Sequence, residues 1–395
     1  MRFSSRIAWG AEVNPMTKLL RRKRAEGVEI LDLTITNPTR ADFNYPAAQI
    51  LDSLHDPRSL SYDPHPAGLL SAREAIAEYY VEKDLDVSPE RLILTASTSE
   101  AYSYLFKLLT EPDDAVLVPT PSYPLFEHLA GMERVRIEPY PLVYEGTWRI
   151  NWEGLEAAVM SRVRALILVN PNNPTGSFLK RDELPKLIAF CRARELALIV
   201  DEVFADYSLR DDTRRAGSIS DVDEILTFCL SGLSKVAGLP QMKLGWIAVN
   251  GPRGLREQAL EGLEWIADTY LSVAAPVQCG AKALLAAGAV VRTEIQRRTR
   301  ANLTFLQAAI ASSALRVLDV EGGWSAILEV PRVRTEEEWT LKLLETSNTL
   351  LQPGFFYDFD HEAFLVVSLL TAPQILEEGV KRILAESNSR VLRST

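Results

Sequence analysis

The chain has 395 residues, of which 47% are hydrophobic and 24% charged. This composition excludes a disordered or collagen-like protein, and the length favours a large domain with a smaller one. Lys and Arg total 43 against 53 for Asp and Glu, so the formal net charge of -10 disfavours nonspecific binding to nucleic acid. The basic run 21–24 accordingly predicts a solvated helix face rather than a nucleic-acid patch.

Targeting, membrane and metal signals are missing from the sequence. The opening residues MRFSSRIAWG include Trp9 but no apolar core of a secretory signal, and no run of 18 apolar residues predicts a membrane span. Cys191, Cys229 and Cys279 lack metal-type spacing and lie in apolar surroundings, which indicates reduced thiols in a cytoplasmic protein. The scattered histidines predict no metal site.

Short apolar runs recur along the chain, and each is closed by small, polar or turn residues. They cover 91–95, 115–119, 165–170, 196–204, 225–231 and 244–250. Helical patterns follow them, the first over 101–109. Strands that alternate with helices predict an α/β fold with a mostly parallel sheet flanked by helices. We expect residues 40–280 to form this large, ligand-binding domain.

The rest of the chain predicts a smaller α+β domain. After the last apolar run come two helical patterns over 255–272 and 281–311, then two strand-like stretches over 324–330 and 364–370 and a closing helix. We expect residues 1–39 to join residues 281–395 in this domain.

Ligands of open α/β sheets bind at the carboxyl ends of the strands, so the residues after each run are candidates for a site. Ser97, Thr98 and Ser99 follow the first run and open a helix, where N–H groups and hydroxyls can hold a phosphate. Taken alone, an ordinary helix cap with Glu100 behind it explains them better. Tyr123 stands between two prolines after the second run and can stack on an aromatic ligand, although a structural tyrosine is equally consistent.

The next three runs add an amide, a carboxylate and an amine. The segment 170–176, NPNNPTG, predicts a rigid loop that presents Asn173, unless it is only a turn. Asp201 ends a buried strand and needs a partner, either a ligand cation or an interior salt bridge. Lys235 can act as a nucleophile if its pKa is lowered, whereas a lone lysine is usually a surface charge. Lys243 can add a second cation at the phosphate.

This ordered set resembles the class I and II aminotransferases, enzymes of the aspartate-aminotransferase fold (pyridoxal-phosphate fold type I). The likeness runs from about residue 30 to the C-terminus and is strongest in NPNNPTG (170–176), DEVFADY (201–207) and SGLSKVAGLPQMKLGW (231–246). It implies pyridoxal 5'-phosphate as cofactor, with Lys235 as the Schiff-base lysine and Asp201 as the partner of the ring nitrogen.

The resemblance also implies the remaining cofactor contacts. Asn173 matches the asparagine that binds the phenolic oxygen, and Tyr123 the stacking ring. The phosphate-binding positions match Ser97, Thr98, Ser99, Ser234 and Lys243. In the family, the tyrosine of a segment like YDPHPAG (62–68) reaches the neighbouring subunit's cofactor, so Tyr62 implies a homodimer with shared active sites.

Four positions depart from the family pattern. Phe204 stands where a tyrosine usually bonds the phenolic oxygen, Lys243 where arginine is common, and Gly232 where many relatives have serine. Val366 replaces the arginine that clamps the substrate α-carboxylate, and no arginine lies between Arg334 and Arg382. Losing that bidentate pair removes roughly 2–3 kcal/mol of recognition.

Another group therefore takes the carboxylate, or the substrate is held differently. The candidates are Asn37, Arg40 and Arg6, with Trp324, Phe355, Phe356 and Tyr357 as pocket-lining or core aromatics.

We expect a dimeric cytoplasmic aminotransferase that moves an amino group from an amino-acid-like donor to a keto acid by a ping-pong mechanism. A lyase, decarboxylase or racemase with the same cofactor is the first alternative. A noncatalytic module of this fold is the second. Neither nucleic acid nor membrane is an expected partner.

Overall fold

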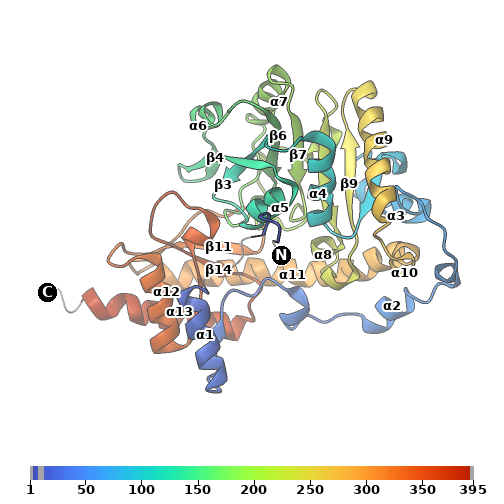
Figure 1. Ribbon diagram of the computed structural model, residues 1–395. Coiled ribbons are helices and arrows are strands. Elements are labelled where there is room, and N and C mark those ends of the chain that lie inside the picture. Colours follow the sequence, from blue (N-terminus) through green and yellow to red (C-terminus); the bar gives the residue numbers. More distant parts are fainter. Residues whose placement is uncertain (1–2, 8–12, 392–395) are drawn as a thin grey trace.

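The computed structural model describes residues 3–7 and 13–391. Trp9 and the last four residues of the predicted small domain lie outside them. A larger unit contains a wide sheet with helices on both sides. A smaller unit joins the two ends of the described chain, in blue and in orange to red (Figure 1).

An eight-stranded sheet forms the larger unit. Its spatial order is β2 (Leu92–Thr95), β9 (Gly245–Asn250), β8 (Thr227–Gly232), β7 (Ala197–Asp201), β6 (Val163–Val169), β3 (Ala115–Thr120), β4 (Arg136–Tyr144) and β5 (Trp148–Ile150). β9 is antiparallel to both its neighbours and β5 is antiparallel to β4, while the other neighbours run parallel. The mostly parallel sheet is confirmed. The sequence pattern does not predict β4 or β5. In β4, Pro139 and Pro141 argue against a strand, and β5 has only three residues.

Thirteen α-helices occur in the described residues. They are α1 (Pro15–Ala25), α2 (Ala47–Asp52), α3 (Leu70–Val81), α4 (Thr98–Leu109), α5 (Leu125–Glu133), α6 (Trp152–Ala157), α7 (Leu184–Ala193), α8 (Leu233–Val236), α9 (Arg253–Tyr270), α10 (Ala275–Cys279), α11 (Ala281–Ile310), α12 (Glu336–Ser347) and α13 (Pro373–Val391). Short 3-10 turns are η1 (Pro38–Arg40), η2 (Pro57–Leu60), η3 (Pro89–Arg91), η4 (Ile219–Asp221), η5 (Pro240–Met242) and η6 (Gly354–Tyr357).

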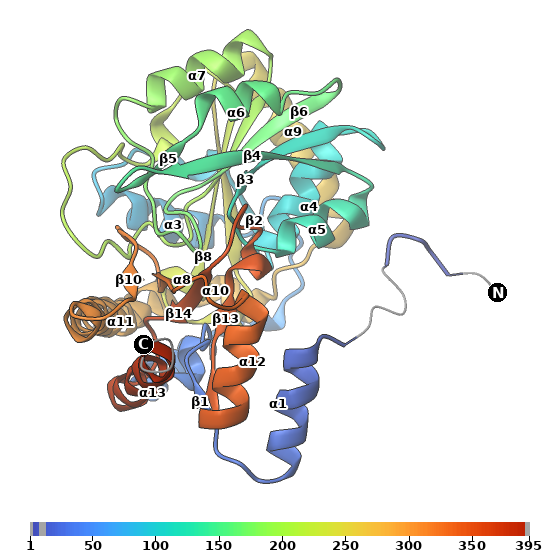
Figure 2. The same ribbon diagram turned by 90° about the vertical axis from the view of Figure 1, so that its left-hand side faces the viewer.

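Each face of the large sheet has its own hydrophobic core, because successive strand residues point to opposite faces. Leu117 and Leu198 pack on the face covered by α3, α7 and the first half of α11. Val116 and Ile199 pack on the face covered by α4, α5 and α9. Helices therefore flank the sheet on both sides, as Figure 2 shows edge-on.

The smaller unit is built from two short sheets. They comprise the antiparallel set β10 (Arg316–Val317), β11 (Ser325–Glu329), β14 (Phe364–Ser368) and β13 (Gln352–Pro353), and the parallel pair β1 (Leu31–Asp32) and β12 (Thr349–Leu350). α11 connects the two units, since its Leu284 lies in a core of the large sheet and its Leu306 in the core of the small unit.

Helix α1 shows that the basic run is not a fully solvated face. Lys23 is buried, and its Nζ donates to the backbone oxygen of Glu345 at 2.8 Å and to Asn348 Oδ1 at 2.7 Å. Arg22 also pairs with Glu345, at 3.0 Å. The prediction is wrong for Lys23, because α1 packs against α12.

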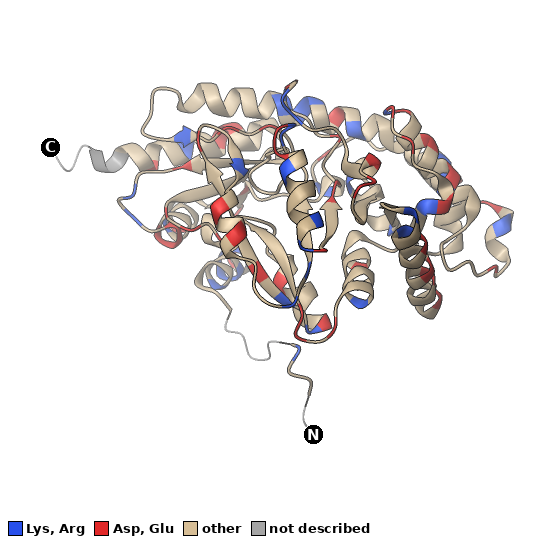
Figure 3. Cartoon of the chain, turned by 90° about the horizontal axis from the view of Figure 1, so that it is seen from above, with Lys and Arg blue, Asp and Glu red and all other residues tan. Residues whose placement is uncertain are grey.

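Charges of both signs are interspersed on the outer helices in the view of Figure 3. Within the described part of the chain, no helix combines the length and the apolar character needed to cross a bilayer. Cys191 and Cys229 are buried free thiols, and Cys279 is a partly exposed one.

Candidate active site

A cavity of about 670 Å³ lies at the carboxyl ends of β3, β6, β7 and β8, bordered by the start of α4 and by the small unit. The predicted residues that line it are Ser97, Thr98, Ser99, Tyr123, Asn173, Asp201, Phe204, Ser234, Lys235, Lys243 and Trp324. The fold thus brings together the positions at successive strand ends.

The start of α4 forms one end of the cavity. Ser97 caps the helix, since its Oγ accepts from the Glu100 N–H at 3.3 Å, and Glu100 Oε2 accepts from the Ala96 N–H at 2.6 Å. The first N–H groups of a helix have no acceptor within it and carry partial positive charge. With the hydroxyls of Thr98 and Ser99, they make this end suited to an anion.

Two glycines allow the strands to approach this end closely. A Cβ on Gly245 would lie 3.1 Å from the carbonyl carbon of Ser97, and one on Gly232 would lie 3.0 Å from the Leu244 oxygen. A serine at position 232, as in many relatives, would therefore press on the start of β9. Ser97 and Ser234 are among the hydroxyls available instead.

Asp201 is held by two donors. Its Oδ1 accepts from the Val203 N–H and its Oδ2 from the Tyr102 hydroxyl, both at 3.1 Å. Burial raises the pKa of Asp201 to about 6, while these hydrogen bonds and the charge of Lys235 oppose the rise. Tyr102 is a site residue that the sequence does not reveal. The one signal is its position, a helical turn after Thr98.

Lys235 lies between aromatic rings. Its Nζ is 4.6 Å from the ring centre of Trp324 and 5.2 Å from that of Phe204. Burial lowers the pKa of Lys235 to about 8, against the opposing charge of Asp201. The amine is therefore far easier to deprotonate than a surface lysine.

Tyr207 does not supply the hydroxyl that Phe204 lacks. Tyr207 is the closest candidate along the chain, but its hydroxyl donates to the backbone oxygen of Lys235 at 2.5 Å. Phe204 and Tyr207 both pack edge-on against Trp324. This aromatic cluster fixes the Lys235 backbone and side chain.

The loop that carries Asn173 is held on both sides. Asn172 Nδ2 donates to the Pro121 oxygen and to Thr175 Oγ1, both at 2.9 Å. Gly176 has φ +68, and a Cβ there would lie 2.4 Å from the Gly322 oxygen. Asn173 itself contacts Ser325 of the small unit, Oγ to Oδ1, at 3.4 Å.

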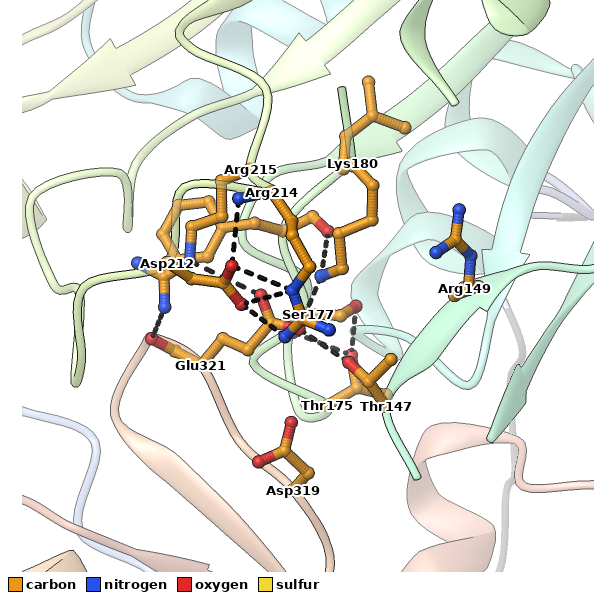
Figure 4. A network of polar contacts seen from close by, with 12 residues as sticks. Thr147, Arg149, Thr175, Ser177, Lys180, Asp212, Arg214, Arg215, Asp319 and Glu321 are labelled. Carbon is orange, nitrogen blue, oxygen red and sulfur yellow. Dashed lines mark hydrogen bonds and ion pairs between the residues drawn. The ribbon is translucent and has the colours of Figure 1, made fainter. Parts of the chain in front are cut away.

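A buried polar network lies beside this loop. Figure 4 shows Lys180, Arg215 and Thr147 of the large unit converging on Glu321, which precedes β11. Lys180 and Glu321 are each only 1% exposed, with Nζ and Oε1 2.5 Å apart. The network fixes the segment that carries Trp324 against the large unit.

Several predicted residues lie elsewhere. Asn37 caps η1, where its Oδ1 accepts from the Thr39 N–H. Neither Asn37 nor Arg40 lines the cavity, whereas the adjacent Thr36 does. Arg6 is exposed. Tyr62 is 84% exposed and borders a separate hollow of about 580 Å³.

Only some of the aromatic residues at positions 355–357 line the cavity as predicted. Phe356 and Tyr357 line the cavity, whereas Phe355 does not. Val366 is buried in an apolar cluster with Trp148 and Ile327.

The shifted pKa of Lys235 predicts how fast an amine-reactive reagent modifies it. In cofactor-free protein, we expect the rate with trinitrobenzenesulfonate to rise half-maximally near pH 8, because only the unprotonated amine reacts. The unfolded chain keeps this proton up to a pKa near 10.5. Lys235 therefore costs folding stability below pH 8, and the cost vanishes as the pH rises from 8 to 10.5.

The matched variant is Asp201→Asn. Since the Asp201 charge raises the pKa of Lys235, its removal should move the midpoint to lower pH. A peptide that contains Lys235 provides the unfolded reference, and a folded-state midpoint equal to that of the peptide would contradict the prediction.

Comparison with known proteins identifies relatives of this chain. A sequence model of the family described as aminotransferase class I and II matches residues 29–383. Glutamate-pyruvate aminotransferase AlaA of Escherichia coli K12 is 29% identical over 266 residues, 67% of this chain and 65% of that protein. S-alkyl-thiohydroximate lyase SUR1 of Arabidopsis thaliana is 31% identical over 242 residues, 60% of this chain and 51% of that protein. The matches thus span less than two thirds of these relatives.

Solved structures share the fold over nearly the whole chain. Alanine aminotransferase from Pyrococcus furiosus superposes with a TM-score of 0.88 and 22% identity, over 98% of this chain and 100% of that one. The family match includes every strand of the large sheet and the segments that line the cavity. The chain therefore belongs to the class I and II aminotransferase family and has its fold.

Proposed function

We propose that this protein is a pyridoxal-phosphate-dependent aminotransferase that moves an amino group from an amino-acid-like donor to a keto acid by a ping-pong mechanism. One observation carries the proposal. In a single cavity, a lysine whose pKa is lowered to about 8 lies near a buried carboxylate and the open start of a helix.

The residues of the cavity fit pyridoxal 5'-phosphate. The start of α4 with Lys243 suits its phosphate, and the buried Asp201 suits a protonated ring nitrogen. We assign Asn173 to its phenolic oxygen and Tyr123 to its ring, which agrees with their positions in the lining of the same cavity. When bound, the cofactor supplies an aldehyde that condenses with amines and a ring that withdraws electrons from the substrate carbon.

Two side chains of the protein then manage protons. Asp201 is ionised above a pKa of about 6, so at neutral pH it holds a proton on the facing ring nitrogen. Lys235, with a pKa of about 8, can accept a proton from the substrate carbon and return it at neutral pH. Trp324 and Phe204 flank its Nζ, which limits the access of water.

Replacing Tyr102 with phenylalanine should weaken cofactor binding by roughly three- to tenfold, because the variant loses one hydrogen bond to Asp201 and only part of its energy of roughly 1.5–3 kcal/mol acts on the cofactor. The hydroxyl lowers the pKa of Asp201, so its loss leaves less carboxylate ionised near neutral pH. Cofactor affinity is measured by fluorescence titration at pH 6.5 and 8.5, and the defect should be larger at pH 6.5. A pH-independent defect would contradict this account.

Transfer of isotope tests the function itself. Holoprotein is mixed with ¹⁵N-labelled amino donors and, after removal of free donor, with keto acids. An aminotransferase keeps the label on the protein until a keto acid arrives and then releases a labelled amino acid. Absence of any labelled product across a panel of donors would refute the proposal.

A lyase is the second candidate, favoured by the similarity to S-alkyl-thiohydroximate lyase over 60% of this chain. The same experiment separates the two functions. A lyase cleaves the donor without requiring a keto acid as amino-group acceptor, and no label passes to the keto acid.

We also propose a homodimer in which Tyr62 serves the partner's site, which agrees with its 84% exposure outside its own cavity. A heterodimer of Tyr62→Ala and Lys235→Ala subunits, purified through two tags, has one intact site. It should show about half of the wild-type activity. If Tyr62 acted within its own subunit, the heterodimer would be no more active than half of the Tyr62→Ala homodimer.

The remaining assignments follow from the same proposal. We assign cofactor binding to residues 40–280 and the closing of the cavity to residues 1–39 and 281–395. The free cysteines support a cytoplasmic location.

A further inference from the structure

The small unit forms a wall of the cavity without a cation. Among the described residues that line the cavity, the cations are Lys235 and Lys243, and both belong to the large unit. The small unit contributes side chains that are all uncharged at neutral pH, namely Thr36, Trp324, Ser325, Gln352, Phe356 and Tyr357.

Within the described part of the chain, neither Val366 nor the arginines on either side of it along the chain supply a cation to the wall. Val366 on β14 lies opposite Gln352 and is buried in an apolar cluster that includes Tyr357. Arg334 and Arg382 of the small unit are engaged by Glu386 and Glu378. Lys235 is committed to the cofactor under the proposed function, and Lys243 lies two residues from Gly245, which packs on the start of α4.

The wall instead offers neutral donors. The Tyr357 hydroxyl donates to Gln352 Oε1, which leaves the Nε2 hydrogens of Gln352 without a partner among the described residues. The Trp324 Nε1–H is buried and also has no partner there. Unpaired donors that line a cavity favour a ligand that brings an acceptor.

A carboxylate fits this wall poorly. On binding, the carboxylate would lose its hydration without gaining an oppositely charged partner, and hydrogen bonds from neutral donors would compensate only part of that cost. A carbonyl of an amide or ester is desolvated at a much smaller cost and accepts from the same donors.

We propose that this wall selects amine substrates whose group beside the amine-bearing carbon is uncharged, such as a carboxamide or ester, and that Gln352 determines this preference. A keto acid, whose carboxylate meets the same wall, then binds more weakly than the preferred donor. The apolar part of the substrate lies against Phe356 and Trp324. This inference deepens the proposed function and rests on it for the place of the reacting amine.

Unreactive ligands test the preference without catalysis. Binding of 3-phenylpropanamide and of 3-phenylpropanoate to the holoprotein is measured by isothermal titration calorimetry. The amide should bind at least about tenfold more tightly than the carboxylate. Equal or tighter binding of the carboxylate would overturn the inference, and so would failure of both ligands to bind.

Two variants test Gln352. Gln352→Arg places a cation on the wall and should reverse the preference, whereas Gln352→Met removes the donors and should abolish it. Far-ultraviolet circular dichroism and the thermal midpoint check folding, and Gln352→Met serves alone if the arginine variant misfolds. An amide preference unchanged in Gln352→Met would overturn the role of Gln352.

Amino transfer from ¹⁵N-labelled phenylalaninamide and phenylalanine separates this inference from the proposed function. Amide-selective binding without transfer from either donor would refute the function and support the selectivity of the wall. Transfer from phenylalanine at least about tenfold faster than from its amide would support the function and overturn the inference.

Discussion

Lys235→Ala protein is expected to transfer amino groups roughly 10³-fold more slowly than the wild type, because one side chain provides both the covalent attachment and the proton carrier. Its Nζ is held between Trp324 and Phe204, and burial lowers its pKa to about 8. No other lysine or histidine among the described cavity residues can take over except Lys243, which lies toward the phosphate end. The measurement is the single-turnover rate with ¹⁵N-labelled donor.

The matched control is Lys282→Ala, which removes a lysine that is 74% exposed on α11. This variant should keep wild-type rates. Borohydride reduction followed by peptide mapping gives a second readout, since the cofactor mass should be fixed to Lys235 in wild type and control and to no residue in Lys235→Ala. Fixation to another lysine in the wild type would contradict the assignment.

Much of the cavity could be predicted because its residues follow strand ends. Asn173 and Lys235 come shortly after apolar runs, and Asp201 follows the apolar residues 196–200 of a third. Parallel strands place such residues along one edge. Tyr102 could not be predicted in this way, because its contact with Asp201 depends on how α4 packs against the sheet. Gln352 could not be predicted either, since it reaches the cavity only through the register of β13 with β14.

The elements of the fold also differ in whether residues nearby in the sequence predict them. Apolar runs predict six neighbouring strands of the large sheet, from β2 at one edge to β3, whereas the paired strands β4 and β5 at the other end lack that signal. The pairing of Leu31 with Thr349 joins opposite ends of the chain and has no local signature. Lys23 is buried for the same reason, since α12 covers it only after the ends meet.

Replacing Glu321 with alanine should lower the free energy of unfolding by roughly 3–5 kcal/mol, the usual cost of leaving buried charges without their partner. Lys180 is 1% exposed and Arg215 only 11%, so neither can reach water when the carboxylate is lost (Figure 4). Thr147 Oγ1 would also lose its acceptor. Urea denaturation measures the change.

The exposed pair Arg253 and Glu257 on α9 provides the control, because Glu257→Ala should cost no more than about 0.5 kcal/mol. A double-mutant cycle with Lys180→Met then isolates the buried pair. The double variant Lys180→Met/Glu321→Ala should be less destabilised than the sum of the single variants, with a coupling of roughly 1–3 kcal/mol.

The buried network around Glu321 also positions a segment that lines the cavity, so a change in it should affect both folding stability and cofactor binding. Leu209 N–H donates to the backbone oxygen of Glu321 at 2.9 Å, and the Glu321 carboxylate pairs with Lys180 and Arg215 of the large unit. The carboxylate therefore anchors the segment that leads to Trp324. We therefore expect Glu321→Ala to weaken cofactor binding as well, while Glu257→Ala does not. Additive single variants, or a destabilisation no larger than that of Glu257→Ala, would show that the buried charges are held by other contacts.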